Sequence, residues 1–259
     1  MVAPPSWSNR FELKAGRWVF EPTTEARAKG LLIKAAIQEV WKPPKFFYHL
    51  RSGGHVAALR AHLDATVFAR VDIEDFFGSV NRSRVTRSLK SRFSYLRARE
   101  MARDSVVNHP TAIPQRFILP YGFVQSPLLA SLALFDSALG TLLCRFAKTS
   151  GLNVSVYVDD IIISGTDALL LQDCLAQVEV TAAKSGFSLN AAKTMGPSAS
   201  ITAFNIDLAH SDMQVESARY NEFVEAFAAT SNPAQQAGIA WYVHSVNTNQ
   251  AKAFLEALP

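Results

Sequence analysis

The sequence predicts an α+β fold in which helices cover one face of an antiparallel sheet. Segments with helical periodicity and short β-branched segments follow one another in mixed order along the 259 residues. Two apolar arms flank a pair of adjacent aspartates, which is typical of a tight antiparallel hairpin. Because 49% of the residues are hydrophobic and only 19% are charged, the chain has the material for a core and is not a disordered protein.

The first elements are a helix and an ambiguous segment. Residues 23–41 have the spacing of an amphipathic helix, with a threonine at its start as the N-cap. Residues 45–50 and 55–59 flank an Arg-Ser-Gly-Gly turn and predict a β-hairpin. The alternative is a helix over 55–63, because its apolar residues also share a helical face.

The middle of the chain predicts the sheet and its covering helices. Residues 67–73 are rich in β-branched and aromatic residues and predict a strand. We expect one basic helix over 83–103 and one long apolar helix over 126–148. The hairpin arms are 154–157 and 161–164.

The remaining elements are shorter. Residues 167–184 predict an amphipathic helix that ends at Gly186 in the left-handed C′ position. Pro233 fits the first position of a later helix. Two short strands and a helical end region complete the prediction, over 187–189, 199–207 and 216–259.

Several features limit the class of protein. Cys144 and Cys174 lie in apolar segments and are too few for a disulfide framework, so we expect buried free thiols in a reducing cytoplasm. Residues 1–20 lack the apolar core of a signal peptide. The apolar stretch 117–146 is interrupted by proline, glycine and aspartate, which favours a buried helix over a membrane span. We expect no membrane partner.

Charge is distributed unevenly between the two parts of the chain. Residues 1–103 hold 19 Lys and Arg against 9 Asp and Glu, whereas residues 104–259 hold 7 against 13. A basic part beside an acidic part indicates polyanion binding next to a cation-binding centre. A solvated basic helix face would give the same counts.

Three aspartates are the candidate chemical centre. Asp72 ends an apolar strand and precedes two phenylalanines, a position that also suits a turn or a helix cap. Asp159 and Asp160 stand inside an apolar block, where buried charges cost several kcal/mol each unless a cation compensates them. If the Asp72 strand lies beside the hairpin, three oxygen ligands converge. Such a site suits Mg²⁺, and two ions about 4 Å apart would activate a 3′-hydroxyl and stabilise departing pyrophosphate.

Two further segments complete the pattern. Gly122 permits close backbone approach to a ligand, and Ser126 followed by proline makes a good helix start. Lys193 follows a helix end and, taken alone, is a solvated lysine.

The order of these segments resembles the reverse transcriptases, in particular the compact bacterial ones of retron, group II intron-related and defence-associated types. The matching motifs are an Asp followed by a Phe-Phe pair, Pro-x-Gly-x-x-x-Ser-Pro, aromatic-x-Asp-Asp and Gly-x-x-x-Asn-x-x-Lys. They lie at 71–77, 119–127, 157–160 and 186–193, and residues 203–206 occupy the place of the primer-grip hairpin.

The resemblance implies a right-hand polymerase fold and its reaction. The expected parts are fingers with the N-terminal basic region (1–66), a catalytic palm (67–215) and a short helical thumb (216–259). The expected reaction is RNA-directed addition of dNMP to a 3′-hydroxyl, with two Mg²⁺ ions or Mn²⁺ as a substitute. Expected partners are an RNA template, the DNA product, dNTP, and a structured non-coding RNA or partner protein. The expected setting is a bacterial retron or antiviral defence system.

The resemblance also implies roles for single residues. Asp72, Asp159 and Asp160 match the catalytic metal ligands, together with the backbone carbonyl of Ile73. Lys193 matches a lysine near the leaving pyrophosphate. Phe77 matches the steric gate, since its ring leaves a ribose 2′-hydroxyl buried without a partner, at a cost of about 1–3 kcal/mol. The other expected contacts are Tyr121, Gly122 and Ser126 in the nucleotide pocket, Lys45, Arg51 and Arg60 on the triphosphate, and Arg84, Arg87 and Lys90 on nucleic acid.

Tyr121 departs from the family pattern, which commonly has Gln there. A tyrosine offers one hydroxyl and a stacking face in place of an amide. This departure motivates a rival hypothesis of template-independent or protein-primed DNA synthesis. A second rival is a catalytically weak palm-fold subunit that binds RNA or protein, and a third is an RNA polymerase.

Overall fold

A four-stranded antiparallel sheet forms the centre of the protein. The computed structural model describes residues 5–256. The strand order is β6-β7-β3-β8, so two strands far apart in the chain are neighbours at the middle. Every residue of β7 is buried, as expected for an apolar strand between two partners. The strands are β3 (Val67–Asp72), β6 (Leu152–Tyr157), β7 (Asp160–Gly165) and β8 (Met195–Ser198).

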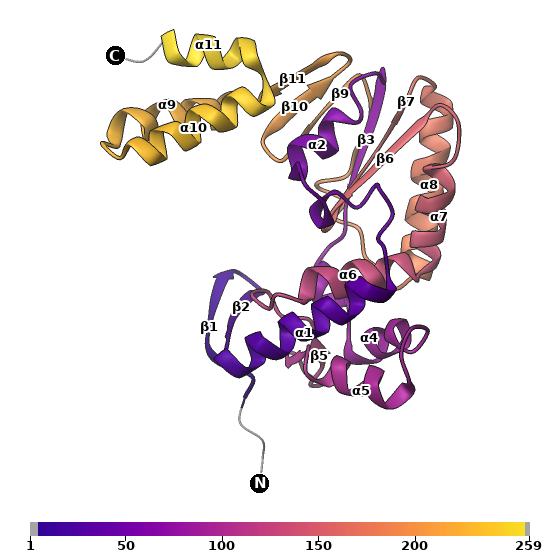
Figure 1. Ribbon diagram of the computed structural model, residues 1–259. Helices are drawn as coiled ribbons and strands as arrows, with labels where there is room; N and C mark the ends of the chain where they lie inside the picture. Colours follow the sequence, from indigo (N-terminus) through magenta and orange to yellow (C-terminus); the bar gives the residue numbers. More distant parts are fainter. Residues whose placement is uncertain (1–4, 257–259) are drawn as a thin grey trace.

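Helices cover one face of this sheet, which confirms the predicted fold class. α7 (Ala138–Phe146) and α8 (Ala168–Lys184) run beside the strands, and α6 (Ser126–Phe135) lies below them (Figure 1). Val71, Ile161 and Ile163 pack against these helices in one apolar cluster. Asp167 caps α8 at its start, and Gly186 follows the helix with φ of +67°, as predicted.

The opposite face supports a second sheet and the C-terminal helices. Phe68 and Ile162 pack into a separate cluster with this sheet. The second sheet has the order β11-β10-β9, from β9 (Ser200–Ala203), β10 (Ile206–Ala209) and β11 (Asp212–Val215). The helices are α9 (Ser217–Ala229), α10 (Pro233–Val246) and α11 (Thr248–Glu256), and Pro233 takes the predicted first position of α10.

The N-terminal part contains a hairpin that the sequence prediction missed. β1 (Trp7–Lys14) and β2 (Arg17–Pro22) pair as an antiparallel hairpin before α1 (Thr24–Val40), which Thr23 caps. The predicted hairpin at 45–59 is wrong, and the helical alternative is right. A 3₁₀ turn, η1 (Tyr48–Leu50), is followed there by α2 (Gly54–Arg60).

Two predicted long helices are each broken. The basic segment forms α4 (Arg82–Leu89) and α5 (Tyr95–Arg103), because the Ser94 side chain caps a new helix. The apolar segment bends by 79° between α6 and α7, where the Ser137 side chain accepts the N–H of Gly140. The predicted strand at 187–189 is reduced to a single bridge between Ile73 and Leu189. The remaining short elements are α3 (Phe76–Ser79), β4 (Val107–Asn108) and β5 (Phe117–Ile118).

Two further properties are the length of the apolar helices and the state of the two cysteines. Across residues 5–256 no single helix is long and apolar enough to cross a bilayer, and only the bent pair α6 and α7 reaches that length and hydropathy together. Cys174 is buried and Cys144 is half-buried, and both are free thiols.

Candidate active site

The sheet register brings the predicted acidic residues together. Asp72, the last residue of β3, lies directly opposite Asp160, the first residue of β7. The Ile73 N–H donates to the Asp159 carbonyl at 2.9 Å, and the Asp72 carbonyl accepts the Asn190 N–H at 2.9 Å. The end of β3 is therefore fixed from both sides, and three acids from two distant segments meet at one edge of the sheet.

The turn between the strands is strained and is held by a histidine. Val158, its first residue, has φ of +59°, which is unfavourable for a β-branched side chain. The Val158 N–H donates to Nδ1 of His49 at 3.0 Å, so the ring proton belongs on Nε2, which lies 2.7 Å from Oγ of Ser131. Burial lowers the pKa of His49 to about 4, so the ring is neutral near pH 7 and keeps this acceptor. His49 is a positioning residue that the sequence analysis missed.

Asp160 is already paired within the chain. Nε of Arg70 donates to its Oδ1 at 2.8 Å, and Nη2 of Arg70 lies 2.7 Å from the same oxygen. Burial raises the pKa of Asp160 above its ordinary value, although the positive charge of Arg70 opposes the shift. Arg70 reaches this carboxylate because it stands two residues before Asp72 on β3, on the same face of the sheet.

Asp159 carries the excess negative charge of the site. Burial, with the charges of Asp160 and Asp72, raises the pKa of Asp159 to about 6, and Arg17 offsets part of that shift. A divalent cation would relieve this repulsion.

The metal ligands predicted from the sequence stay a prediction. Among residues 5–256 no three Asp, Glu, His or Cys side chains lie close enough to hold one ion together. The Asp160 carboxylate is turned to Arg70, and Oδ2 of Asp72 is turned to Lys193, so each of these two acids already has a cation beside it. Mg²⁺ is typically held by one or two carboxylates with substrate phosphates, so the site does not need all three acids for one ion.

Lys193 reaches the same edge of the sheet from a separate loop. Its Nζ donates to Oδ2 of Asp72 at 3.0 Å, and the lysine side chain is 49% exposed whereas that of Asp72 is 4% exposed. The isolated interpretation as a solvated lysine is wrong. The cation faces both the carboxylate and the solvent.

Phe77 and Tyr121 form an aromatic wall beside the acids. Their ring centroids are 4.6 Å apart, and Phe77 is 6% exposed. The guanidinium of Arg17, on β2, lies over the Tyr121 ring, 5.1 Å from its centroid. Burial raises the pKa of Tyr121, Arg17 lowers it, and Asp159 is among the charges that raise it. Arg17 thus belongs to this site, although only the cluster of basic residues near the N-terminus pointed to it in the sequence.

Two predicted pocket residues have structural roles. Gly122 has φ of +100°, and a Cβ there would lie 2.2 Å from the Phe20 carbonyl oxygen, so the close partner is β2. Ser126 is fully buried at the start of α6, and its hydroxyl has no partner among the described residues. Gly122 is exposed beside β2, so its predicted nucleotide contact stays a prediction, whereas the buried Ser126 side chain offers no open surface to a nucleotide.

The three predicted triphosphate cations point elsewhere. Lys45 lines a cavity at the far end of β6, beside Leu152 and away from the turn. Arg51 donates to the Lys45 carbonyl at 2.7 Å and lies 5.0 Å from the Tyr48 ring. Arg60 donates to the Ser245 carbonyl on α10. Their predicted contact with the triphosphate stays a prediction, but in the structure their side chains face the loop before α2 and the C-terminal helices.

The predicted nucleic-acid residues lie on α4, outside the acidic edge. Arg84 and Arg87 line a cavity with the end of α8, and Lys90 is exposed at the end of α4. The residues 203–206 form the predicted hairpin, and the ring of Phe204 lies 5.2 Å from that of Tyr157 beside the acidic turn.

Comparisons with known proteins agree with this geometry. Residues 16–219 match the family model described as reverse transcriptase (RNA-dependent DNA polymerase). No curated protein matches the chain in sequence.

Several solved structures are similar to the chain at low sequence identity. The apo telomerase of Candida tropicalis superposes with a TM-score of 0.52 and 11% identity, over 90% of this chain and 47% of that one. A foamy viral protease-reverse transcriptase in complex with an RNA/DNA hybrid has a TM-score of 0.49 and 15% sequence identity, over 81% of this chain and 26% of that one. The telomerase of Candida albicans with a fragment of telomeric RNA has a TM-score of 0.49 and 8% sequence identity, over 89% of this chain and 48% of that one. The chain therefore spans between about a quarter and a half of these proteins.

Proposed function

Because the chain belongs to the reverse transcriptase family, we propose that it extends a DNA 3′-hydroxyl with deoxynucleotides on an RNA template, using two divalent cations at Asp72 and Asp159. The single observation that supports this most is the register of β3 and β7, which places Asp72 opposite Asp160 and joins Ile73 to Asp159. The family generally uses divalent metals. When bound, the ions would activate the attacking hydroxyl and stabilise the departing pyrophosphate.

The residues of the chain prepare the site for that chemistry. Arg70 holds Asp160, and His49 holds the backbone of the turn. Lys193, which is half-exposed on Asp72, is placed to meet a phosphate of the leaving group. Arg17 takes over the task predicted for the three cations that point elsewhere: it would bind the triphosphate of the incoming nucleotide from β2.

The wall made by Phe77 and Tyr121 is proposed to exclude ribonucleotides. The Phe77 ring is nearly buried against Tyr121, so a 2′-hydroxyl beside it would find neither space nor a hydrogen-bond partner. The enzyme would therefore select deoxynucleotides.

The test is the loss of synthesis on removing one carboxylate. Asp159→Asn and Asp72→Asn should each lower the rate of dNTP incorporation on a primed RNA by at least about a thousandfold, since they remove a charge that would hold the cation. The control is Asp173→Asn, an exposed acid on α8. Unchanged incorporation in Asp159→Asn would overturn the proposal and favour a palm-fold subunit that only binds RNA or protein.

A second candidate is DNA synthesis without a template or with a protein primer. The observation that favours it is Tyr121, whose ring is in contact with Phe77 and Arg17 in the place where the family commonly has an amide. Incubation with single dNTPs and no nucleic acid tests it, and strictly template-dependent product would exclude it. We propose a bacterial cytoplasmic setting, in a retron or antiviral defence system, on family likeness alone.

A further inference from the structure

A basic cavity lies on the outer side of the molecule, behind the active site. It has a volume of about 400 Å³ and is formed by α4, the corner between α6 and α7, and the end of α8. In Figure 1 these helices lie away from the open side of the C-shaped chain. Phe187 and Phe76, both buried and with ring centroids 5.9 Å apart, stand between the end of α8 and the aromatic wall. The cavity is thus separate from the acidic edge.

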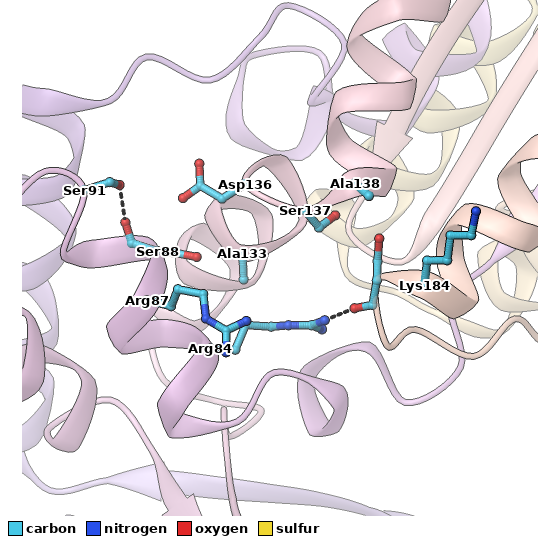
Figure 2. A pocket seen from close by; sticks show the side chains of 10 residues that line it. Arg84, Arg87, Ser88, Ser91, Ala133, Asp136, Ser137, Ala138 and Lys184 are labelled. Carbon is cyan, nitrogen blue, oxygen red and sulfur yellow. Dashed lines mark hydrogen bonds between the residues drawn. The ribbon is translucent and has the colours of Figure 1, made fainter.

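Positive charge dominates its lining. Arg84, Arg87 and Lys184 border the cavity, and its one carboxylate, Asp136, is bound by Arg92 at 2.7 and 2.9 Å. Figure 2 shows the two arginines along one side of the cavity, with Asp136 and Ser137 across from them. Arg87 and Lys184 are exposed and make no ion pair among the residues that the structure describes.

One of the cations is already fixed in place. Arg84 donates to the Ser185 carbonyl, and its guanidinium lies 4.3 Å from the Phe187 ring. Burial lowers the pKa of Arg84, and the nearby charge of Arg87 lowers it further. Two like charges therefore stand close together, and an anion between them would relieve their repulsion. Holding Arg84 in advance reduces the ordering that such an anion would require.

The lining matches a phosphate and not a base. Ser91 and Ser137 already donate their hydroxyl protons to backbone carbonyls, which leaves the hydroxyls of Ser88 and Ser185 for a phosphate. The remaining side chains of the lining are alanines and the charged residues already named. The cavity has no aromatic side chain on which a base could stack, so a free nucleotide would be held by its phosphate alone.

The neighbouring helix α5 also carries arginines, of which Arg103 is paired with Glu100 and Asp104. A second cavity of about 390 Å³ is lined by Arg82, Arg99 and Arg103, with Glu100 and Leu96, where α4 meets α5. Successive phosphates of one strand are the ligand that such a row of cations fits.

We propose that the cavity between α4, the α6–α7 corner and α8 binds backbone phosphates of a nucleic acid strand away from the acidic edge of the sheet, with Arg87 and Lys184 as the exposed contacts and Arg84 as the fixed one. The inference rests on the proposed function only in that the ligand is nucleic acid. Because binding is measured without synthesis, failure of the phosphate-binding proposal does not decide the proposed polymerase function, and the reverse also holds.

The experiment compares two double variants of the full chain. Arg87→Ala with Lys184→Ala removes the two exposed cations of the cavity. The control, Lys148→Ala with Lys252→Ala, removes two exposed cations elsewhere and changes the net charge by the same amount. Anisotropy of a labelled RNA of about 30 nucleotides, and of a DNA of the same length, is titrated at several salt concentrations. Two shorter ligands complete the experiment: a hybrid of about 8 base pairs, which has few phosphates to reach both the acidic edge and the cavity, and dATP alone.

The cavity variant should bind the long strand about tenfold more weakly at low salt. The slope of log affinity against log salt should fall by about 0.7 for each lost phosphate contact on a single strand. The control variant and the short hybrid should show neither change, and the RNA and DNA arms show which strand the cavity holds. Equal losses in the two double variants, an equal loss for the short hybrid or for dATP, or no loss at all would overturn the proposal.

Discussion

Arg70 and Asp160 are joined across the central sheet by two contacts to one oxygen, from Nε at 2.8 Å and Nη2 at 2.7 Å. The third nitrogen, Nη1, donates to the Thr202 carbonyl on β9 at 2.8 Å. One guanidinium therefore connects the acidic turn with the second sheet, on which the C-terminal helices rest. The position of the Asp160 carboxylate beside Asp72 is thus tied to the second sheet through one side chain.

Removing Arg70 should destabilise the fold and the site together. The side chains of Arg70 and Asp160 are only 17% and 11% exposed, so Arg70→Met leaves a buried charge unpaired and should lower the free energy of unfolding by about 3–5 kcal/mol. Combining it with Asp160→Asn should recover most of that loss, because no charge then remains unpaired. Urea unfolding of Arg70→Met, of Asp160→Asn and of the double variant measures the three free energies of unfolding. Additive losses in the double variant would show that the pair is not coupled.

Shortening Phe77 should relax the choice of sugar. Phe77→Val opens space beside Tyr121, and the use of ribonucleotides relative to deoxynucleotides should rise by about tenfold or more. The measurement is kcat/KM for each nucleotide in single-nucleotide extension. Phe76→Leu, which changes a buried ring facing Phe187, is the control for loss of packing. An unchanged ratio in Phe77→Val removes the gate assignment.

Arg17 should act on nucleotide binding more than on the chemical step. Arg17→Ala removes the cation beside Tyr121 and should raise KM for dNTP by about tenfold while kcat changes little. Arg10→Ala is the matched control, because Arg10 stands on the same hairpin but stacks on Trp7 and Trp18. Steady-state kinetics would contradict the assignment if both variants raised KM equally.

His49 should matter through the backbone that it holds. His49→Ala leaves the Val158 N–H without its acceptor, at a cost of about 1–3 kcal/mol, and lets the strained turn relax. We expect kcat to fall about tenfold or more with little change in the affinity for a primed template. His49→Asn, which retains an acceptor, should recover part of the rate. His244→Ala, at an exposed position on α10, should behave as wild type.

Acid should destabilise the protein through His62. Its two ring nitrogens lie 2.7 and 2.8 Å from Ser164 and Ser155, and burial lowers its pKa from 6.5 to about 3. Between those two pH values the unfolded chain takes up a proton that the folded chain does not, so the free energy of unfolding falls as pH falls, by up to about 1.4 kcal/mol per pH unit.

Asp159 works in the opposite direction, because its folded pKa is raised to about 6. The comparison of wild type with His62→Gln isolates the histidine, since the carboxylate is common to both. Denaturant midpoints measured between pH 7 and about 4 should converge at the acid end. Parallel curves would mean that the pKa of His62 is the same in the folded and the unfolded chain.

Local patterns predicted most of the central part of the fold. The alternation along β3 and around the two adjacent aspartates fixed the strands, their hairpin and the position of Asp72, because side chains of one strand keep to two faces. Lys193 was found through its motif, and its contact with Asp72 needed the structure.

Other features depend on contacts between distant residues. The residues of β1 are mostly polar and exposed, so the sequence did not reveal a strand that pairs with β2. The helix breaks at Ser94 and Ser137 depend on single capping bonds. The pairing of Asp160 with Arg70 and of Val158 with His49 joins segments 90 and 109 residues apart, which no local pattern records.

The N-terminal hairpin turns at Gly16, which is also where the match to the family begins. A shortened protein cut at that boundary would discard β1 and leave β2 as an open edge, with its hydrogen-bonding groups free to recruit a neighbouring molecule. We expect the shortened protein to aggregate through this edge. Loss of β1 would also loosen β2, the strand that carries Arg17 and packs over Gly122. Preparation of this enzyme should therefore retain the residues ahead of the recognised family segment.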